Sequence, residues 1–564
     1  MNSLEYQSDQ HEEQTPEPIV VFQAKHVVTM DPGRPTADAV AVRDGRIVSV
    51  GSLASMQQWL DTHPHIVDDT FADNVIMPGF VDPHTHLRWG GTATSLPYVG
   101  PITSPTGAPA TPTRQDVLSH LRALDAAMPP GEPLFVWGFD PAYQDGHLHR
   151  DELDQVSKDR PIWVLAYAIH YLYANSPMLE AIGADESSEI HGVGRYPDGR
   201  LDGTFVEMEA VRFAQKPFAD LINNRDAARQ GLRALAKTVQ RAGVTTTADM
   251  GLGVQDFDQE LEDHLEIVNQ PDFPLRMVMA SAEIAMNMEH GTNAAQFVAD
   301  LTRQSTDKLR FHGVKMWLDG SYQAMSLRLK YPGYISGGNG LRGDVAWNEL
   351  TERMLPYWER GIPIHAHANG DEAIDAALDT LEELQRRAPR FNHRFTMEHY
   401  LISDTAQARR LASLGGLASV LVQYVHHRSQ IQNKQGLGPD RADATARLGS
   451  LAREGVTFGL HSDFAFALLP ISPLEAAWTA VTRLAADNRT VQAPGERINI
   501  ERALRAITID AAYVIGMDHL VGSLEVGKYA DLVVLDQDPT AGNPEDLRDV
   551  RVIATVLGGT KIPT

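Results

Sequence analysis

The stretch PGFVDPHTHL, residues 78–87, places two histidines two positions apart directly after an apolar run. Successive side chains of a β-strand point to opposite faces, so His84 and His86 share one face while Thr85 points away. The pattern therefore predicts that two imidazoles converge at the end of a buried strand. An isolated pair of this kind is more often two hydrogen-bonded histidines than a metal site, so the rest of the chain must distinguish the two interpretations.

Seven further apolar runs follow this one and alternate with amphipathic segments. We expect the strands at 75–86, 243–250, 275–282, 313–320, 362–370, 394–400, 417–424 and 456–463. Segments 227–243 and 371–387 carry apolar residues at helical spacing, and Ser472 followed by Pro473 is a typical helix start. Eight alternating strand and helix units predict an α/β fold, a (β/α)8 barrel.

The chain outside these units has a different pattern. About 150 residues separate the first two strands, too many for one crossover, and this insertion at about 90–230 is rich in Trp and Tyr. An insertion after the first strand lies on the C-terminal face of a barrel, so we expect a lid and substrate-binding subdomain. β-branched runs near both chain ends predict one discontinuous β-sandwich from 18–75 and 517–564, which leaves 76–516 for the barrel with its insertion and an acidic, disordered tail at 1–17.

Composition excludes several classes of function. A net charge of -25 over 564 residues argues against nucleic acid and anionic membranes as partners. The chain has no cysteine, so histidines, carboxylates or a modified side chain would have to bind any metal. The N-terminal stretch is acidic and polar without an apolar core, so we expect no signal peptide, and without an apolar run of about 18 residues we expect no membrane span. We therefore expect a cytoplasmic enzyme for a small-molecule substrate, and leave a homo-oligomer open.

Six polar side chains fall at the predicted C-terminal ends of barrel strands: His84, His86, Lys315, His367, His399 and Asp463. Barrel geometry brings the C-terminal ends of all strands to one mouth. Taken singly, Lys315 could be a strand-end lysine with a solvated ammonium group, and Asp463 a helix N-cap. The shared position of all six favours a metal site.

These motifs resemble the amidohydrolase superfamily, specifically its YtcJ-like branch, amidohydrolase family 3, which includes N-substituted formamide deformylases. The resemblance runs from about residue 20 to the C-terminus. PGFVDPHTHL is similar to the family's first-strand metal motif, VKMWLDGS (314–321) to its lysine motif and MEHY (397–400) to its sixth-strand histidine. HAHANGDEAID (365–375) and GVTFGLHSDFA (455–465) are similar to its fifth- and eighth-strand motifs. The match is highly specific for the family and weakly specific for the substrate.

The resemblance implies a site for one or two divalent metal ions, with zinc expected. In the two-ion form His84, His86 and Asp463 hold one ion, His367 and His399 hold the other, and a carbamylated Lys315 bridges them. A bound ion lowers the pKa of water from about 15.7 to about 7, so the resemblance implies that metal-bound hydroxide attacks a carbonyl. Asp463 is then the candidate acid and base.

Further residues are candidates for the substrate side of the site. His170 resembles a family histidine that could polarise the carbonyl, although a packed, hydrogen-bonded role is as consistent with its surroundings. The candidates for substrate binding are Arg88, Trp89, Trp317 and Arg441. Arg88 could pair with a carboxylate or be a solvated loop charge. Two histidines two residues before proposed ligands, His365 and His461, are expected deeper in the barrel in a packing or supporting role.

The leading interpretation is a hydrolase that cleaves a non-peptide carbon–nitrogen bond in a small N-acyl or N-formyl amide. Aromatic residues near the predicted mouth suggest an apolar or aromatic substrate. Hydrolysis of an ester, a lactone or a cyclic amide needs the same attack on a carbonyl and remains an alternative. A catalytically silent regulatory or binding protein is the alternative from a different class, because a fold alone does not confer activity.

Overall fold

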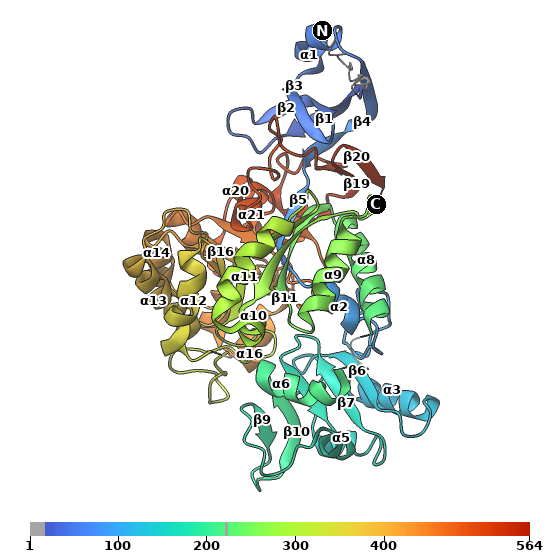
Figure 1. The fold of residues 1–564 in the computed structure, drawn as a ribbon, viewed down its shortest axis with the longest axis vertical. Helices are drawn as coiled ribbons and strands as arrows, with labels where there is room; N and C mark the ends of the chain where they lie inside the picture. The colour runs from blue at the N-terminus through green and yellow to red at the C-terminus, as the bar shows by residue number, and fades with distance from the viewer. Residues whose placement is uncertain (1–16, 220–223, 344, 564) are drawn as a thin grey trace, which may run out of the picture.

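A computed structural model describes residues 17–219, 224–343 and 345–563. The chain forms a small sheet domain, a central barrel and an inserted domain, and the small sheet and the insertion lie at opposite ends of the barrel (Figure 1). All but the last residue of the expected acidic tail lies outside the described residues. Among the helices of the described ranges, none combines the length and the apolar character that a membrane span requires.

The barrel consists of one parallel sheet in which the strands follow chain order. Its strands are β5 (Phe80–Thr85), β11 (Val244–Leu252), β12 (Arg276–Ala282), β13 (Leu309–Trp317), β14 (Ile364–Ala368), β15 (Thr396–His399), β16 (Leu417–Val420) and β17 (Phe458–Leu460). The segment after β17 returns to β5, where the Asp463 amide donates to the His84 carbonyl at 3.1 Å and the His86 amide donates to the Phe464 carbonyl. The predicted (β/α)8 barrel and its eight strands are confirmed.

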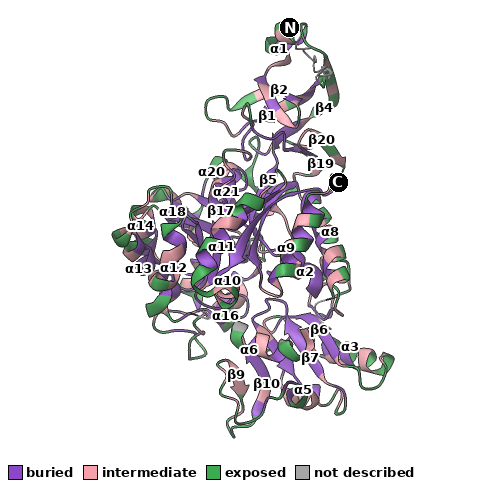
Figure 2. Cartoon of the chain, viewed as in Figure 1, coloured by how far each residue is buried: buried purple, intermediate pink, exposed green. Residues whose placement is uncertain are grey.

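Amphipathic helices cover the outside of this sheet, whose strands are buried (Figure 2). Helix α13 (Asp371–Arg387) begins and ends where the sequence pattern predicts, and α8 (Arg225–Arg241) buries the predicted apolar stripe. Helix α19 (Pro473–Thr482) starts after Ser472, whose side chain accepts a hydrogen bond from a backbone amide of the first turn. The other helices of the barrel region include α2 (Leu87–Ala93), α9 (Phe257–Val268), α10 (Glu283–His290), α11 (Ala294–Leu301), α12 (Leu350–Glu359), α14 (Thr405–Ser413), α15 (Tyr424–His427), α16 (Ser429–Gln435), α17 (Pro439–Asp443), α18 (Leu448–Arg453), α20 (Ile500–Ala506) and α21 (Ile509–Val514).

The small domain combines both ends of the described chain. Its seven strands run in the order β20 (Thr560–Pro563), β19 (Val552–Leu557), β18 (Leu532–Leu535), β4 (His65–Pro78), β1 (Ile19–Val28), β2 (Thr36–Arg43) and β3 (Arg46–Gly51). The strands of the predicted β-sandwich are hydrogen-bonded into one continuous sheet, because β4 pairs with β1 on one side and with β18 on the other. Strand β4 then leads directly into β5, so this sheet anchors the first barrel strand.

The insertion after β5 carries its own five-stranded sheet. The strand order is β6 (Leu134–Phe139), β7 (Ile162–Ala166), β8 (Tyr171–Ala174), β10 (Leu201–Val206) and β9 (Val193–Arg195), with helices α3 (Arg114–Ala127), α5 (Ser176–Ile182) and α6 (Glu207–Gln215). Strands β7 and β8 are separated by a short turn. This turn ends at His170 and faces the mouth of the barrel.

Candidate metal centre

Three side chains of types that can bind a metal meet where the first and last barrel strands end. His84 lies in β5, His86 follows it, and Asp463 lies three residues beyond the end of β17. The Nε2 atoms of His84 and His86 are 3.3 Å apart, and Asp463 Oδ1 lies 3.5 Å from the former and 3.3 Å from the latter. Such spacing allows one cation to contact all three donors.

The other predicted ligands border this group. Lys315, in β13, places its Nζ 3.4 Å from His84 Nε2. The rings of His367 and His399 have centroids 4.5 Å apart, and His399 Nδ1 lies 3.9 Å from Asp463 Oδ2. His367 Nε2 lies 2.8 Å from the side-chain nitrogen of Asn369. The structure thus brings all six predicted residues to one mouth, with the first three in the tighter arrangement.

Glu398, which the sequence analysis did not single out, lies directly beneath these ligands. Its two carboxylate oxygens each accept a 2.7 Å hydrogen bond, one from His84 Nδ1 and one from His365 Nδ1. The residue is fully buried, and although burial alone would raise its pKa, the two imidazoles hold the pKa well below the usual range. The bond to Glu398 places the His84 proton on Nδ1 and leaves Nε2 free to bind a metal.

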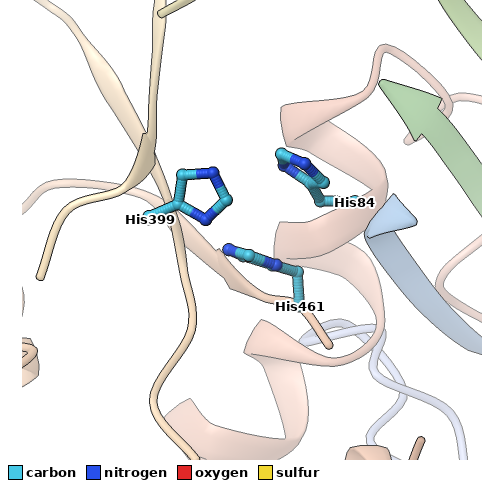
Figure 3. Close-up of side chains that lie close together, drawn as sticks. All are labelled: His84, His399 and His461. Carbon is cyan, nitrogen blue, oxygen red and sulfur yellow. The ribbon is translucent and has the colours of Figure 1, made fainter. Parts of the chain in front are cut away.

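His461 also lies closer to the centre than expected. Its ring stacks on His84 with centroids 4.7 Å apart and lies 5.0 Å from the His399 ring, so three imidazoles converge from β5, β15 and the end of β17 (Figure 3). Both ring nitrogens are buried and lack a hydrogen-bond partner within the described residues. Buried polar atoms normally have a partner, so these nitrogens fit a place beside a bound ion or an ordered water.

Burial sets the charge of the imidazoles. It lowers the pKa of His84 to about 3 and that of His461 to about 4, and it holds the pKa values of His367 and His399 well below the ordinary value. Burial would raise the pKa of Asp463, but the neighbouring histidines hold it well below its usual range. These four imidazoles are therefore neutral and the Asp463 carboxylate is ionised, which are the forms that bind divalent ions.

Several residues at the centre have left-handed backbone conformations. The φ angles are 52° at Asp463 and 72° at His399, and in the insertion they are 59° at Ile169 and 65° at Glu207. Non-glycine residues seldom adopt positive φ, and such strain gathers at functional sites where the surrounding structure maintains it. His399 is the last residue of β15 and its side chain approaches Asp463, whereas Glu398 contacts His84 and His365.

His170 lies at the mouth as the sequence predicts. Its Nδ1 donates to Glu207 Oε2 at 2.7 Å, and its ring centroid lies 5.9 Å from that of His367. Burial opposes the charged imidazole, yet the Glu207 carboxylate outweighs it and raises the pKa of His170 above the ordinary value. His170 is therefore a positioned hydrogen-bond donor at the mouth.

A small cavity of about 40 Å³ lies between these groups. Trp89 and Trp317, two of the candidates for substrate binding, line it, together with residues that the sequence did not identify: Ala168, Ile169, Ser321, Tyr322, Asn369, Tyr424 and Phe466. The rings of Trp89 and Phe466 are 5.1 Å apart and form an aromatic wall beside His86. These residues follow strand ends, but their loops have no periodicity that would indicate which side chains turn inward.

The two arginines proposed for substrate binding do not line this cavity. Arg88 is buried, and its guanidinium contacts Asp263 at 2.9–3.0 Å. Arg441 donates to backbone carbonyls of Gly333 and Leu437. A charged guanidinium forms strong hydrogen bonds to carboxylate and carbonyl oxygens, and for both arginines the protein itself supplies these oxygens. Neither placement supports the substrate role that the sequence suggested.

The fold and the donor set are those of a (β/α)8-barrel protein with a candidate metal site at its C-terminal mouth. Residues 72–562 match the model of the amidohydrolase family, and the chain belongs to this family of hydrolases, as its motifs predicted. It is 27% identical over 550 residues to Protein LONG AFTER FAR-RED 3 of Arabidopsis thaliana, which covers 95% of this chain and 90% of the relative. It is 26% identical to N-substituted formamide deformylase of Arthrobacter pascens, with 95% and 96% covered. A solved structure of an uncharacterized metal-dependent hydrolase from Pyrococcus horikoshii OT3 shares the fold, with a TM-score of 0.71 at 18% identity and 93% and 99% of the chains covered.

Proposed function

We propose that this protein is a metal-dependent hydrolase that cleaves the carbon–nitrogen bond of a small, non-peptide N-acyl or N-formyl amide. The observation that carries the proposal is the convergence of His84 Nε2, His86 Nε2 and Asp463 Oδ1 within 3.5 Å of one another at the catalytic end of the barrel. The similarity to N-substituted formamide deformylase supports an amide as substrate.

The side chains present fit a divalent ion such as zinc. Two neutral imidazoles and a carboxylate are common zinc ligands, and His84 already has its other nitrogen bonded to Glu398. The unpartnered nitrogens of His461 support a further group at this centre, because buried polar atoms normally have a partner. When bound, the ion supplies a Lewis acid that polarises a carbonyl and lowers the pKa of water toward neutrality.

The burial of Lys315 is an argument for a second ion beside His367 and His399. Burial lowers the pKa of Lys315 to about 8, so a larger fraction of its amine is neutral than for an exposed lysine. A neutral amine can bond to CO2 and release a proton to form a carbamate. This modification would convert a cationic side chain into an anionic one whose oxygens can bind a metal. We include this carbamate in the proposal as the two-ion form of the site.

Asp463 and His170 divide the remaining work. The ionised Asp463 carboxylate accepts a proton from the attacking water and returns it to the departing nitrogen. His170, held by Glu207 across the mouth from His367, donates a hydrogen bond to the carbonyl oxygen of the substrate, where negative charge develops.

The shape of the site limits the substrate. A cavity of about 40 Å³ accommodates a reacting group of a few atoms, such as a formyl or acetyl carbonyl. Trp89 and Phe466 form the wall beside His86, so the nitrogen substituent would contact aromatic rings as it leaves the mouth. An apolar or aromatic substituent fits this surface best.

The test is a substrate screen with defined metal content. Metal-free protein is reloaded with Zn²⁺, Mn²⁺ or Co²⁺ and assayed on N-formyl, N-acetyl and N-aryl amides together with esters of matching shape. We expect hydrolysis of at least one N-formyl or N-acetyl amide by the reloaded protein, and none by His86→Asn. His290→Asn is the control, because His290 is a histidine beside a glutamate, Glu289, at the end of α10 and does not line the cavity. Preferential ester cleavage would support the ester alternative, and tight ligand binding without any turnover would support the silent protein.

A further inference from the structure

We propose that His426, His427 and Glu475 form an accessory divalent-cation site on the rim of the barrel, separate from the catalytic centre. The two histidines end the short helix α15 (Tyr424–His427), which follows β16, and Glu475 lies in the first turn of α19. One ligand atom from each of the three side chains lies within 4.8 Å of the other two. Segments about fifty residues apart in sequence thus present two imidazoles and a carboxylate to one point.

His426 is oriented as a ligand. Its Nδ1 donates to the backbone carbonyl of Leu484 at 2.8 Å, so the ring proton lies on Nδ1 and Nε2 retains its lone pair. The ring packs edge-on against Trp478, with centroids 5.0 Å apart, which restricts its rotation. Metal-bound histidines usually have such a partner on the second nitrogen.

Glu475 and His427 complete the group. Glu475 Oε2 accepts a hydrogen bond of 2.7 Å from the Gln423 side chain, which fixes the carboxylate, and its Oε1 lies 3.3 Å from His427 Nε2. That Nε2 atom is buried and makes no hydrogen bond within the described ranges of the chain. The nearby carboxylate therefore does not satisfy this nitrogen with a hydrogen bond, whereas a cation between the two groups would bind both.

The site is distinct from the catalytic centre but connected to its walls. None of the three ligands lines the catalytic cavity, whereas Tyr424, at the start of α15, does. The hydroxyl of Tyr143, from the insertion, donates to the His427 carbonyl at 3.1 Å. A cation here would join α15 to α19 and hold the rim beneath the insertion.

The donor set indicates the class of ion. Two imidazoles with one carboxylate suit Zn²⁺, Co²⁺ or Ni²⁺, whereas Mg²⁺ and Ca²⁺ prefer sites made of oxygen alone. Zn²⁺ is therefore the probe for the test, and no step of the proposal depends on the hydrolytic activity.

The experiment counts zinc in the full-length protein. Wild type, His427→Asn, Glu475→Gln and His26→Asn are dialysed against a series of buffered free Zn²⁺ concentrations, and bound zinc is measured by elemental analysis. His26 is the matched control: its Nδ1 lies 2.6 Å from Asp538, the side-chain exposures of 29% and 22% resemble the 28% and 18% of His427 and Glu475, and it belongs to no three-donor group of the described residues. Circular dichroism verifies the fold of each variant, and Glu475→Gln keeps the shape of the side chain.

We expect wild type and His26→Asn to bind about one more zinc per chain than His427→Asn and Glu475→Gln, since loss of one of three protein ligands weakens such a site strongly. The zinc-dependent rise in Tm should shrink in the same two variants. Equal zinc binding by all four proteins at every free concentration would overturn the proposal and leave His427 and Glu475 as an ion pair. Failure of the substrate screen would not affect this result, because the count of bound zinc is independent of turnover.

Discussion

Replacing Glu398 by glutamine should weaken metal binding without unfolding the protein. Glu398 is fully buried and accepts 2.7 Å hydrogen bonds from both His84 and His365. A glutamine has nearly the same shape, but its single amide oxygen can accept from only one of these imidazoles, and its amide nitrogen must face the other. The variant therefore removes the negative charge behind His84 and disturbs the tautomer that leaves His84 Nε2 free.

The magnitude follows from the two bonds. A hydrogen bond to a charged group contributes about 1.5–3 kcal/mol, and each 1.4 kcal/mol corresponds to about tenfold in affinity. His365 Nε2 is buried without a hydrogen-bond partner in the described structure, so His365 can shift its proton to that atom and accept from the glutamine amide. This adjustment reduces the effect to the lower end of the range, about 1.5 kcal/mol, and we expect zinc affinity to fall by about tenfold.

Competition with a fluorescent zinc chelator measures this affinity directly. Glu382→Gln is the control, because Glu382 makes an ion pair with Arg410 on the surface and lies far from the barrel mouth. The control should bind zinc as wild type does. An unchanged zinc affinity in a folded Glu398→Gln variant would refute the inference that Glu398 orients His84.

Four further predictions concern other parts of the site. Arg88→Ala should destabilise the protein by about 1.5–3 kcal/mol in urea unfolding, because it removes one of the three arginines that bind the buried Asp263 carboxylate while Arg225 and Arg229 remain, and should leave KM unchanged; a raised KM at normal stability would restore a substrate role. Glu207→Gln should lower the pKa of His170, so if protonated His170 is required, activity should fall at lower pH on the alkaline limb of the kcat profile than in wild type, and an unmoved limb would contradict that role. Removing metal with a chelator should lower Tm, and zinc at about 100 times Kd should restore about 2.7 kcal/mol of stability, whereas an unaltered Tm would argue against a resident ion. Native mass spectrometry with bicarbonate should show one added CO2 that Lys315→Arg lacks, and an unmodified wild type would exclude the carbamate under those conditions.

The strand pattern predicted most of the fold and the three residues of the tightest donor group. The eight apolar runs match the barrel strands, and the polar residues at their ends, from His84 to Asp463, meet at one mouth. Both results follow from local rules: side chains alternate along a strand, and parallel strands in a barrel end on one face. A sequence displays such rules directly because they depend on neighbours in the chain.

The direction of loop side chains was not visible in this way. Arg88 follows His86 by two residues, yet its side chain turns away from the cavity to Asp263, which lies 175 residues later in the chain. Trp89, the next residue, lines the cavity instead. The helical turn of α2 sends adjacent residues to different sides, and only the packed neighbours determine which side is the site.

The supporting groups of the centre were likewise a matter of tertiary structure. Glu398 became significant because β15 lies beside β14 and across the barrel from β5, which brings one carboxylate between His84 and His365. His461 was expected in a supporting position, but its lack of partners depends on everything packed around it. By itself the sequence determined which residues could bind a metal, because ligand chemistry belongs to each side chain. Only the tertiary structure decided which of them lie within contact distance of one another, since burial and partner distance arise from strands hundreds of residues apart.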